Sequence, residues 1–198
     1  TVGINPVDID ADDFDGDGDI DLVVANFDDD TITTLFNDGS ASFTLTNFAT
    51  GDGPSSLAIT NYVEDGTMLN DIAVGCSVAN PAVISVMQNQ STPGLLGSSF
   101  NLTNSITIPN PTDIDPSDVD NNKDFDYVVL SGSGESVSVY EGNGNGGVMP
   151  GFTIGITLPS GSSPVSQVFG DLNGDGQDDL LTVNNGDGSV SILRNTGS

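Results

Sequence analysis

Histidine and tryptophan are absent from this chain of 198 residues, and cysteine occurs once, as Cys76. A single cysteine forms no disulfide within the chain, and without histidine it has no obvious base to activate it as a nucleophile. Because Cys76 follows the apolar run 71–75, we interpret it as a small buried side chain. The shortage of catalytic residue types argues against an enzyme.

Basic residues are almost as scarce, since Lys123 and Arg194 stand against 29 acidic residues and leave a net charge of -27. Such a surface repels nucleic-acid phosphates and anionic lipids, so we expect neither as a partner. An apolar fraction of 35% and regularly spaced acids favour a folded chain over a disordered one. Folded proteins that gather carboxylates usually neutralise them with cations, and Ca²⁺ prefers oxygen ligands.

Long apolar runs are missing as well. None approaches the ~20 residues that a membrane-spanning helix needs, so we expect no membrane insertion. The chain shows no signal peptide, and we interpret Thr1 as the start of a mature or trimmed chain. Free calcium is abundant outside cells and scarce in the cytosol, so weak structural calcium sites would indicate an extracellular or cell-surface location.

What the chain does contain is a repeat of about 50 residues, read four times. Each unit has a proline, 15 to 17 residues before an aspartate that opens an apolar run. The prolines are Pro6, Pro54, Pro111 and Pro164, and the aspartates are Asp21, Asp71, Asp126 and Asp179. The units span about 6–53, 54–110, 111–163, and 164–198 together with 1–5, as one repeat domain.

Each unit predicts four strands. An alternating stretch follows the proline, and the continuous apolar run predicts a buried second strand. A third alternating strand and a turn rich in Asn and Gly come next, and a fourth strand is expected to begin at Phe43, Phe100 or Phe152. Four-stranded units at this spacing predict an all-β fold, a β-propeller of four four-stranded blades.

Three acidic, Gly-rich loops between the first and second strands predict calcium sites. In each loop, oxygen donors stand at positions 1, 3, 5 and 9, and the backbone carbonyl of position 7 adds another. The ligands are Asp13, Asp15, Asp17, the carbonyl of Asp19, and Asp21; Asp118, Asp120, Asn122, the carbonyl of Asp124, and Asp126; and Asp171, Asn173, Asp175, the carbonyl of Gln177, and Asp179. An EF-hand would require a bidentate Glu at position 12, where these units have Val24, Val129 and Thr182. The pattern therefore indicates calcium loops in β-hairpins.

The second unit departs from this pattern. Its loop, 61–71, has two extra residues, and Val63 stands where a ligand oxygen is expected, so we predict no ion there. Among the other three, we expect the first loop to bind most strongly and the third least, because Lys123 occupies the glycine position of the third loop.

The segments 13–26 and 169–180 resemble the FG-GAP/VCBS repeat family. In the first, Asp-Phe-Asp-Gly-Asp-Gly is followed by Asp-Leu-Val-Val-Ala-Asn, and in the second, Phe-Gly-Asp-Leu-Asn-Gly-Asp-Gly is followed by Asp-Leu. The resemblance covers the units throughout, most closely in the first and fourth. It implies a propeller with calcium in its hairpin loops, typically of about seven blades, and functions that vary among members.

Three kinds of function are compatible with these observations. The first is a non-enzymatic structural or adhesion module of a surface protein, fibre or matrix, with other protein chains or extracellular glycans as partners. The second is a lectin-like, carbohydrate-binding propeller, which the lack of tryptophan disfavours. The third is a glycosidase, which needs only two carboxylates, although the well-placed ones are already assigned to calcium. Two sequons, at Asn89 and Asn101, are candidate glycosylation sites.

The two ends of the chain carry parts of one blade. Residues 1–4 align with the tail of a fourth strand, and the chain ends at the turn 195–198, before such a strand. An unpaired sheet edge is seldom left open. We expect Thr1–Ile4 to complete the fourth blade in the same chain and so close a ring. The alternative is self-association, in which the unpaired blade edge accepts this segment from a neighbour and forms a filament.

Overall fold

The computed structural model describes residues 1–78, 81–93, 99–108 and 110–196, and every helix or strand within them is a β-strand. Fifteen strands form four antiparallel sheets, each of which follows chain order. Blade one contains β1 (Pro6–Asp12), β2 (Asp21–Asn26), β3 (Thr31–Asn37) and β4 (Phe43–Ala49). Blade two contains β5 (Pro54–Thr60), β6 (Asp71–Cys76), β7 (Val83–Asn89) and β8 (Phe100–Thr107). Blade three contains β9 (Asp113–Ser117), β10 (Asp126–Ser131), β11 (Ser136–Gly142) and β12 (Val148–Thr157). Blade four contains β13 (Pro164–Gly170), β14 (Asp179–Asn184) and β15 (Ser189–Leu193).

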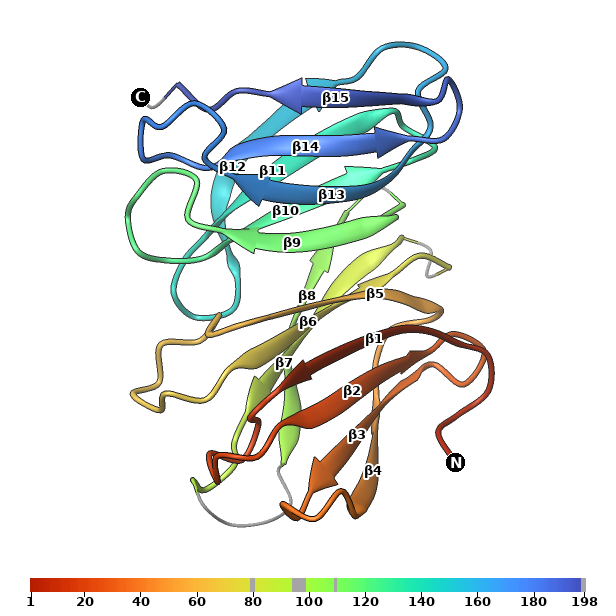
Figure 1. The fold of residues 1–198 in the computed structure, drawn as a ribbon, viewed down its shortest axis with the longest axis vertical. Coiled ribbons are helices and arrows are strands. Elements are labelled where there is room, and N and C mark those ends of the chain that lie inside the picture. The colour runs from red at the N-terminus through yellow and green to blue at the C-terminus, as the bar shows by residue number, and fades with distance from the viewer. Residues whose placement is uncertain (79–80, 94–98, 109, 197–198) are drawn as a thin grey trace.

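The four sheets are the blades of a β-propeller. The first strands of successive blades pack side by side, β1 against β5, β5 against β9, and β9 against β13. In Figure 1 the blades follow one another along the longest axis, and the N- and C-termini lie at its opposite ends. The four blades therefore form an open arc in which blade one and blade four are the two ends.

The pattern of burial explains why the second strands have continuous apolar runs. β6 and β10 are buried along their whole length, because they are covered on both faces by neighbouring blades. The first strands of the end blades are more exposed: β1 is exposed over most of its length, and β13 is exposed at three of its seven residues. A continuous apolar run therefore indicates a strand that is covered on both faces.

Apolar side chains fill the space between each blade and the next. Phe14 of blade one packs edge to face on Phe100 of blade two, with ring centroids 5.6 Å apart. Tyr62 and Tyr127 stack across the next boundary at 4.7 Å. Cys76 is fully buried in the first of these clusters, which confirms its interpretation as a core residue.

The expected closure of the ring by the N-terminal segment is wrong. The N–H of Gly3 donates to Asn26 Oδ1 at 3.1 Å, and the N–H of Ile4 donates to Asp29 Oδ2 at 2.6 Å. These bonds hold the segment on the turn between β2 and β3 of blade one. In the described part of the chain, blade four keeps three strands, and residues 197–198 of the expected final turn lie outside it.

Two strand limits also differ from the expectation. β12 begins at Val148, before Phe152, because its first residue pairs with Gly142 across an irregularity in the register. β9 begins at Asp113 rather than directly after Pro111, and it contains Pro116. A proline is tolerated there because the first strand is the edge of its blade. The fourth strands at Phe43 and Phe100 begin as predicted.

Candidate metal centre

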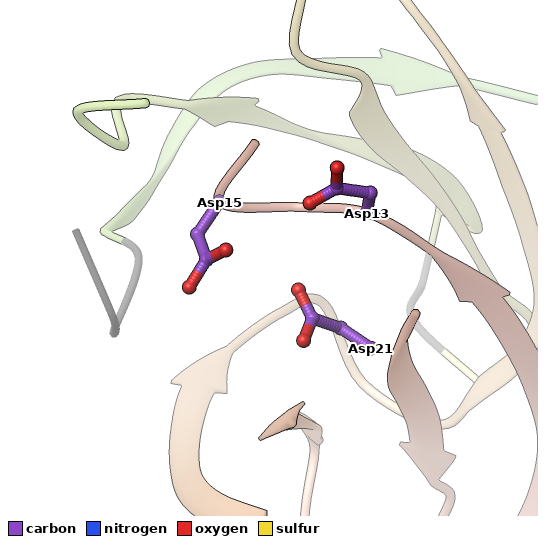
Figure 2. Close-up of side chains that lie close together, drawn as sticks. All are labelled: Asp13, Asp15 and Asp21. Carbon is purple, nitrogen blue, oxygen red and sulfur yellow. The ribbon is translucent and has the colours of Figure 1, made fainter. Parts of the chain in front are cut away.

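The loop between β1 and β2 brings three carboxylates together. Figure 2 shows Asp13, Asp15 and Asp21 directed toward one another. One carboxylate oxygen from each lies within 4.8 Å of the others, and Asp15 and Asp21 are fully buried. Three oxygen donors at this spacing, from residues at positions 1, 3 and 9 of the loop, fit a hard cation such as Ca²⁺.

Backbone hydrogen bonds shape the loop around Asp13. Its Oδ1 accepts from the N–H groups of Gly16 at 2.8 Å and Asp17 at 3.1 Å, and its Oδ2 accepts from that of Gly18 at 3.0 Å. Gly18 has a φ of 95°, a conformation that a side chain would strain. The glycine at position 6 therefore allows the chain to fold back over its own first carboxylate.

Burial makes this group of acids electrostatically costly without a cation. Desolvation raises the pKa of Asp21 to about 6, and the charges of Asp15 and Asp17 add to the rise. The backbone N–H groups that donate to Asp21 oppose it only in part. A divalent cation among these oxygens would offset the repulsion, so the residues present fit the ion that the sequence predicts.

The third loop, between β9 and β10, gathers Asp118, Asp120 and Asp126 in the same way, with one oxygen from each within 4.8 Å. Asp118 accepts from the N–H groups of Asn122 at 2.9 Å and Lys123 at 3.0 Å. Lys123 has a φ of 83°, so a residue with a side chain occupies the turn where the first loop has glycine. Such a conformation costs roughly 1 kcal/mol in a residue other than glycine.

The fourth loop, between β13 and β14, has the same backbone but a different side-chain arrangement. Asp171 accepts from the N–H groups of residues 174, 175 and 176, and the last of these bonds is the largest cause of its lowered pKa. Asn173 Nδ2 donates to Asp179 at 3.1 Å, so its amide oxygen would have to turn inward to bind a cation. Arg194 lies 3.7 Å from Asp175.

These differences change the expected order of the sites. The first loop is the most buried, the third groups three carboxylates, and the fourth is exposed and has a competing guanidinium. We therefore expect affinity to fall from the first loop to the third and then to the fourth, rather than in the order first, fourth, third.

Position 5 plays the same part in all three loops. Asp17, Asn122 and Asp175 each accept a hydrogen bond from the N–H two residues later, at 2.8, 2.7 and 3.0 Å. These N–H groups belong to the residues whose carbonyls the sequence assigns as ligands: Asp19, Asp124 and Gln177. The role of those carbonyls stays a prediction.

The aspartate at position 9 has a second role that the sequence analysis missed. Asp21 Oδ2 accepts from the N–H of Phe14 at 3.0 Å, and its Oδ1 accepts from that of Asn37, the last residue of β3, at 2.8 Å. Asp71 forms the equivalent bonds to Val63 and Asn89, at 2.7 and 2.8 Å. Asp126 and Asp179 repeat the pattern. In every blade, this aspartate links the loop before the second strand to a residue at or near the end of the third strand. Its presence in the second unit, which departs from the ligand pattern, was the sequence signal that could have revealed this structural role.

The loop of blade two is engaged with blade three. Val63 forms a β-bridge with Asn145, and the N–H of Glu64 donates to the carbonyl of Gly144 at 2.9 Å. Asp65 accepts from Gln88 Nε2 at 3.1 Å. This loop therefore provides a contact between blades two and three, and its lack of calcium stays a prediction.

The two sequons differ in accessibility. Asn89 is 1% exposed, and its Nδ2 donates to the carbonyls of Phe14 and Asn70. Asn101 lies exposed on β8. In the folded chain, only Asn101 of this pair presents its amide for glycosylation.

Comparison with protein families supports the repeat assignment. Residues 118–182 match the model of the FG-GAP-like repeat, from the first aspartate of the third loop into β14. No curated protein matches the chain. The match supports an FG-GAP-like repeat in residues 118–182, which span parts of blades three and four.

Proposed function

We propose that this chain is a non-enzymatic, calcium-binding propeller with a structural or adhesive role in an extracellular or cell-surface protein, fibre or matrix. The observation that carries the proposal is the convergence of Asp13, Asp15 and Asp21 within 4.8 Å, which the third loop repeats. FG-GAP-like propellers are typical of ligand-binding and adhesion modules, often bind calcium and usually occur in extracellular proteins. Other protein chains or extracellular glycans are the partners that suit such a role.

Calcium at about three sites would stiffen the blades. An ion held by Asp13 and Asp21 would fix the loop between β1 and β2, and Asp21 is already bonded to the last residue of β3. Extracellular calcium modules bind with dissociation constants of about 10⁻⁴ to 10⁻³ M. At calcium 100-fold above that constant, each independent site adds about 2.7 kcal/mol to the free energy of unfolding.

A matched pair of variants separates calcium binding from the structural role of the ninth aspartate. Asp21→Asn and Asp71→Asn each weaken the same two backbone hydrogen bonds, at a cost of about 1 to 3 kcal/mol. Only Asp21 also belongs to a group of three carboxylates. In calorimetric titrations with calcium, we expect Asp21→Asn to remove or weaken one site at least tenfold and Asp71→Asn to leave every site unchanged. Equal calcium binding by the two variants would contradict the proposal.

A carbohydrate-binding role is the second candidate, because one polar cleft lies between the third and fourth loops. The cleft has a volume of about 310 Å³ and is lined by Asp118, Asn121, Gln177 and the partly exposed ring of Phe125, among others. Calcium beside it could coordinate sugar hydroxyls. Glycan-array binding that requires calcium and disappears in Phe125→Ala would favour this role over a purely structural one.

The described part of the chain contains no helix that is long and apolar enough to span a membrane. The extracellular assignment itself rests on the calcium chemistry and on the repeat family.

A further inference from the structure

The first loop, between β1 and β2, lies against blade two. Phe14, at position 2 of this loop, is fully buried, and its ring packs edge to face on Phe100 of β8. Gly16 has a φ of 71°, and a Cβ at this position would lie 3.1 Å from the side chain of Leu69 in the loop of blade two. The conformation of the first loop therefore depends on residues of a second blade.

Asn89, the last residue of β7 in blade two, binds the backbone of this loop. It is 1% exposed, and its Nδ2 donates to the carbonyl of Phe14 at 2.8 Å. The N–H of Phe14 donates to Asp21 Oδ2 at 3.0 Å, so both hydrogen-bonding groups of this residue's backbone are held. Because Phe14 stands between Asp13 and Asp15, Asn89 fixes the backbone that joins two of the predicted ligands.

Ser91 fixes the orientation of the Asn89 amide. The N–H of Ser91 donates to Asn89 Oδ1 at 3.0 Å, and the hydroxyl of Ser91 donates to the same atom. Because Oδ1 is occupied by these two donors, Nδ2 is the group that faces the carbonyls. The main-chain N–H of Asn89 donates to Asp71 Oδ1 at 2.8 Å. The sequon 89–91 therefore has a structural role in the folded chain.

A second asparagine of blade two contacts the residue before Asp13. Asn70 Nδ2 donates to Asp12 Oδ2 at 2.6 Å, and Asp12 Oδ1 accepts from the N–H of Asp13 at 2.9 Å. The carbonyl of Asn70 accepts from Asn89 Nδ2 at 3.1 Å, so the two asparagines are joined to each other. Blade two thus holds the first loop on both sides of Asp13, the carboxylate around which this loop folds.

The position that Asn89 occupies differs among the blades. It is the position whose N–H donates to the aspartate at position 9, and its residues are Asn37, Asn89, Gly142 and Asn195. The blade after the first loop has Asn89 there, and the blade after the third loop has Asn195. The blade after the second loop, where we expect no ion, has Gly142, which has no side chain to hold a loop. The missing amide thus coincides with the loop that departs from the ligand pattern.

We infer that Asn89 is a positioning residue for the calcium site of the first loop, so that this site is built from two blades. The inference rests on the proposed calcium binding. Asn89 supplies no predicted ligand and acts through the backbone of Phe14. A backbone that is fixed before the ion arrives loses less conformational entropy on binding, which raises the affinity. By the reciprocity of linked equilibria, calcium in the first loop in turn stabilises the contact between blades one and two.

Amide hydrogen exchange in chelator, followed by NMR on the full chain, tests the positioning without calcium. In Asn89→Ala, we expect the N–H groups of Phe14 and Gly18, which bond to carboxylates of the first loop, to exchange at least about tenfold faster. The N–H of Lys123, which forms the corresponding bond in the third loop, should exchange at the same rate as in the unchanged chain.

Asn184→Ala is the matched control. Asn184 is also 1% exposed and donates from Nδ2 to two serine hydroxyls, but it lies in β14 of blade four. It should leave exchange in the first loop unchanged, and equal acceleration by the two variants would overturn the inference. Circular dichroism would verify that the variants fold. If Asn89→Ala does not fold, Asn70→Ala takes its place, and unchanged exchange of the same amides in that variant would overturn the inference too.

Calcium titration followed at the same amides tests the link to the metal. The dissociation constant reported by Gly18 should rise at least about tenfold in Asn89→Ala, whereas that reported by Lys123 should not change. An unchanged constant at Gly18 would overturn the inference. If the loops of the unchanged chain do not respond to calcium, the proposed function is contradicted, and the exchange rates in chelator still decide whether Asn89 positions the first loop.

Discussion

Replacing Asp115 with Asn tests the electrostatics of the centre of the arc. Asp115 lies in β9, and burial raises the pKa of its carboxyl from 3.8 to about 7. The charge of Asp113 adds to this rise, as do those of Asp10 and Asp8 in β1, while a hydrogen bond with Gln167 of β13 lowers it. The first strands of blades one and three thus bring together acidic residues that we do not expect to bind calcium.

The size of the effect follows from the shift. A pKa that rises from 3.8 to about 7 corresponds to about 4 kcal/mol of stability, and partial exposure of the carboxyl reduces this to about 2 kcal/mol. Because the pKa in the folded state lies above that in the unfolded state, this stability is complete below about pH 4 and is lost as the pH rises through about 7. Asn stays neutral, so the variant should melt about 4 to 8 °C higher at pH 8 and nearly unchanged at pH 4.

Differential scanning calorimetry in excess calcium, from pH 4 to pH 8, measures this difference. Asp52→Asn is the matched control, because it removes the same formal charge from an exposed residue. A gain in melting temperature that is equal at both pH values, or equal in the control, would refute the assignment of a raised pKa to Asp115.

Three further predictions address the loops and the blade contacts. Lys123→Gly should relieve the strained turn, raise the free energy of unfolding by roughly 1 kcal/mol and strengthen the third calcium site, as measured by melting and titration; an unchanged melting temperature would contradict the strain. Phe14→Ala should cost about 3 to 5 kcal/mol in chemical denaturation, whereas Leu172→Ala at the same loop position should cost under about 1 kcal/mol, and similar losses would argue against the open arc. In a eukaryotic secretion host, mass spectrometry should find glycan on Asn101 and none on Asn89, and modification of Asn89 would contradict its burial.

The blades and the loop geometry could be predicted from the sequence because both depend on local spacing. The alternation of apolar residues sets the strands, and the aspartates of the first loop stand at intervals that a tight turn brings together. The position of Cys76 in the core follows from the apolar run before it.

The open arc could not be predicted in this way. Ile9 and Leu57 are similar apolar residues at the same place in the repeat, yet one is exposed and the other is buried, because the difference depends on whether a blade precedes them. The double role of Asp21 was also hidden, since one of its partners is the N–H of Asn37, 16 residues away across the sheet. Contacts between residues far apart in the sequence decide both the exposure of Ile9 and the second role of Asp21, and a local sequence pattern gives no information on such contacts.

Calcium-dependent unfolding of the unchanged chain tests the central proposal most directly. Scanning calorimetry would compare the chain in chelator with the chain in calcium at about 100-fold above the dissociation constant. A gain of about 2.7 kcal/mol for each independent site corresponds to a rise in melting temperature of about 5 to 11 °C per site. With the first and third loops occupied, we expect a rise of at least about 10 °C, which magnesium at the same concentration does not reproduce. A melting temperature that is the same in chelator and in calcium would contradict the assignment of these loops as calcium sites.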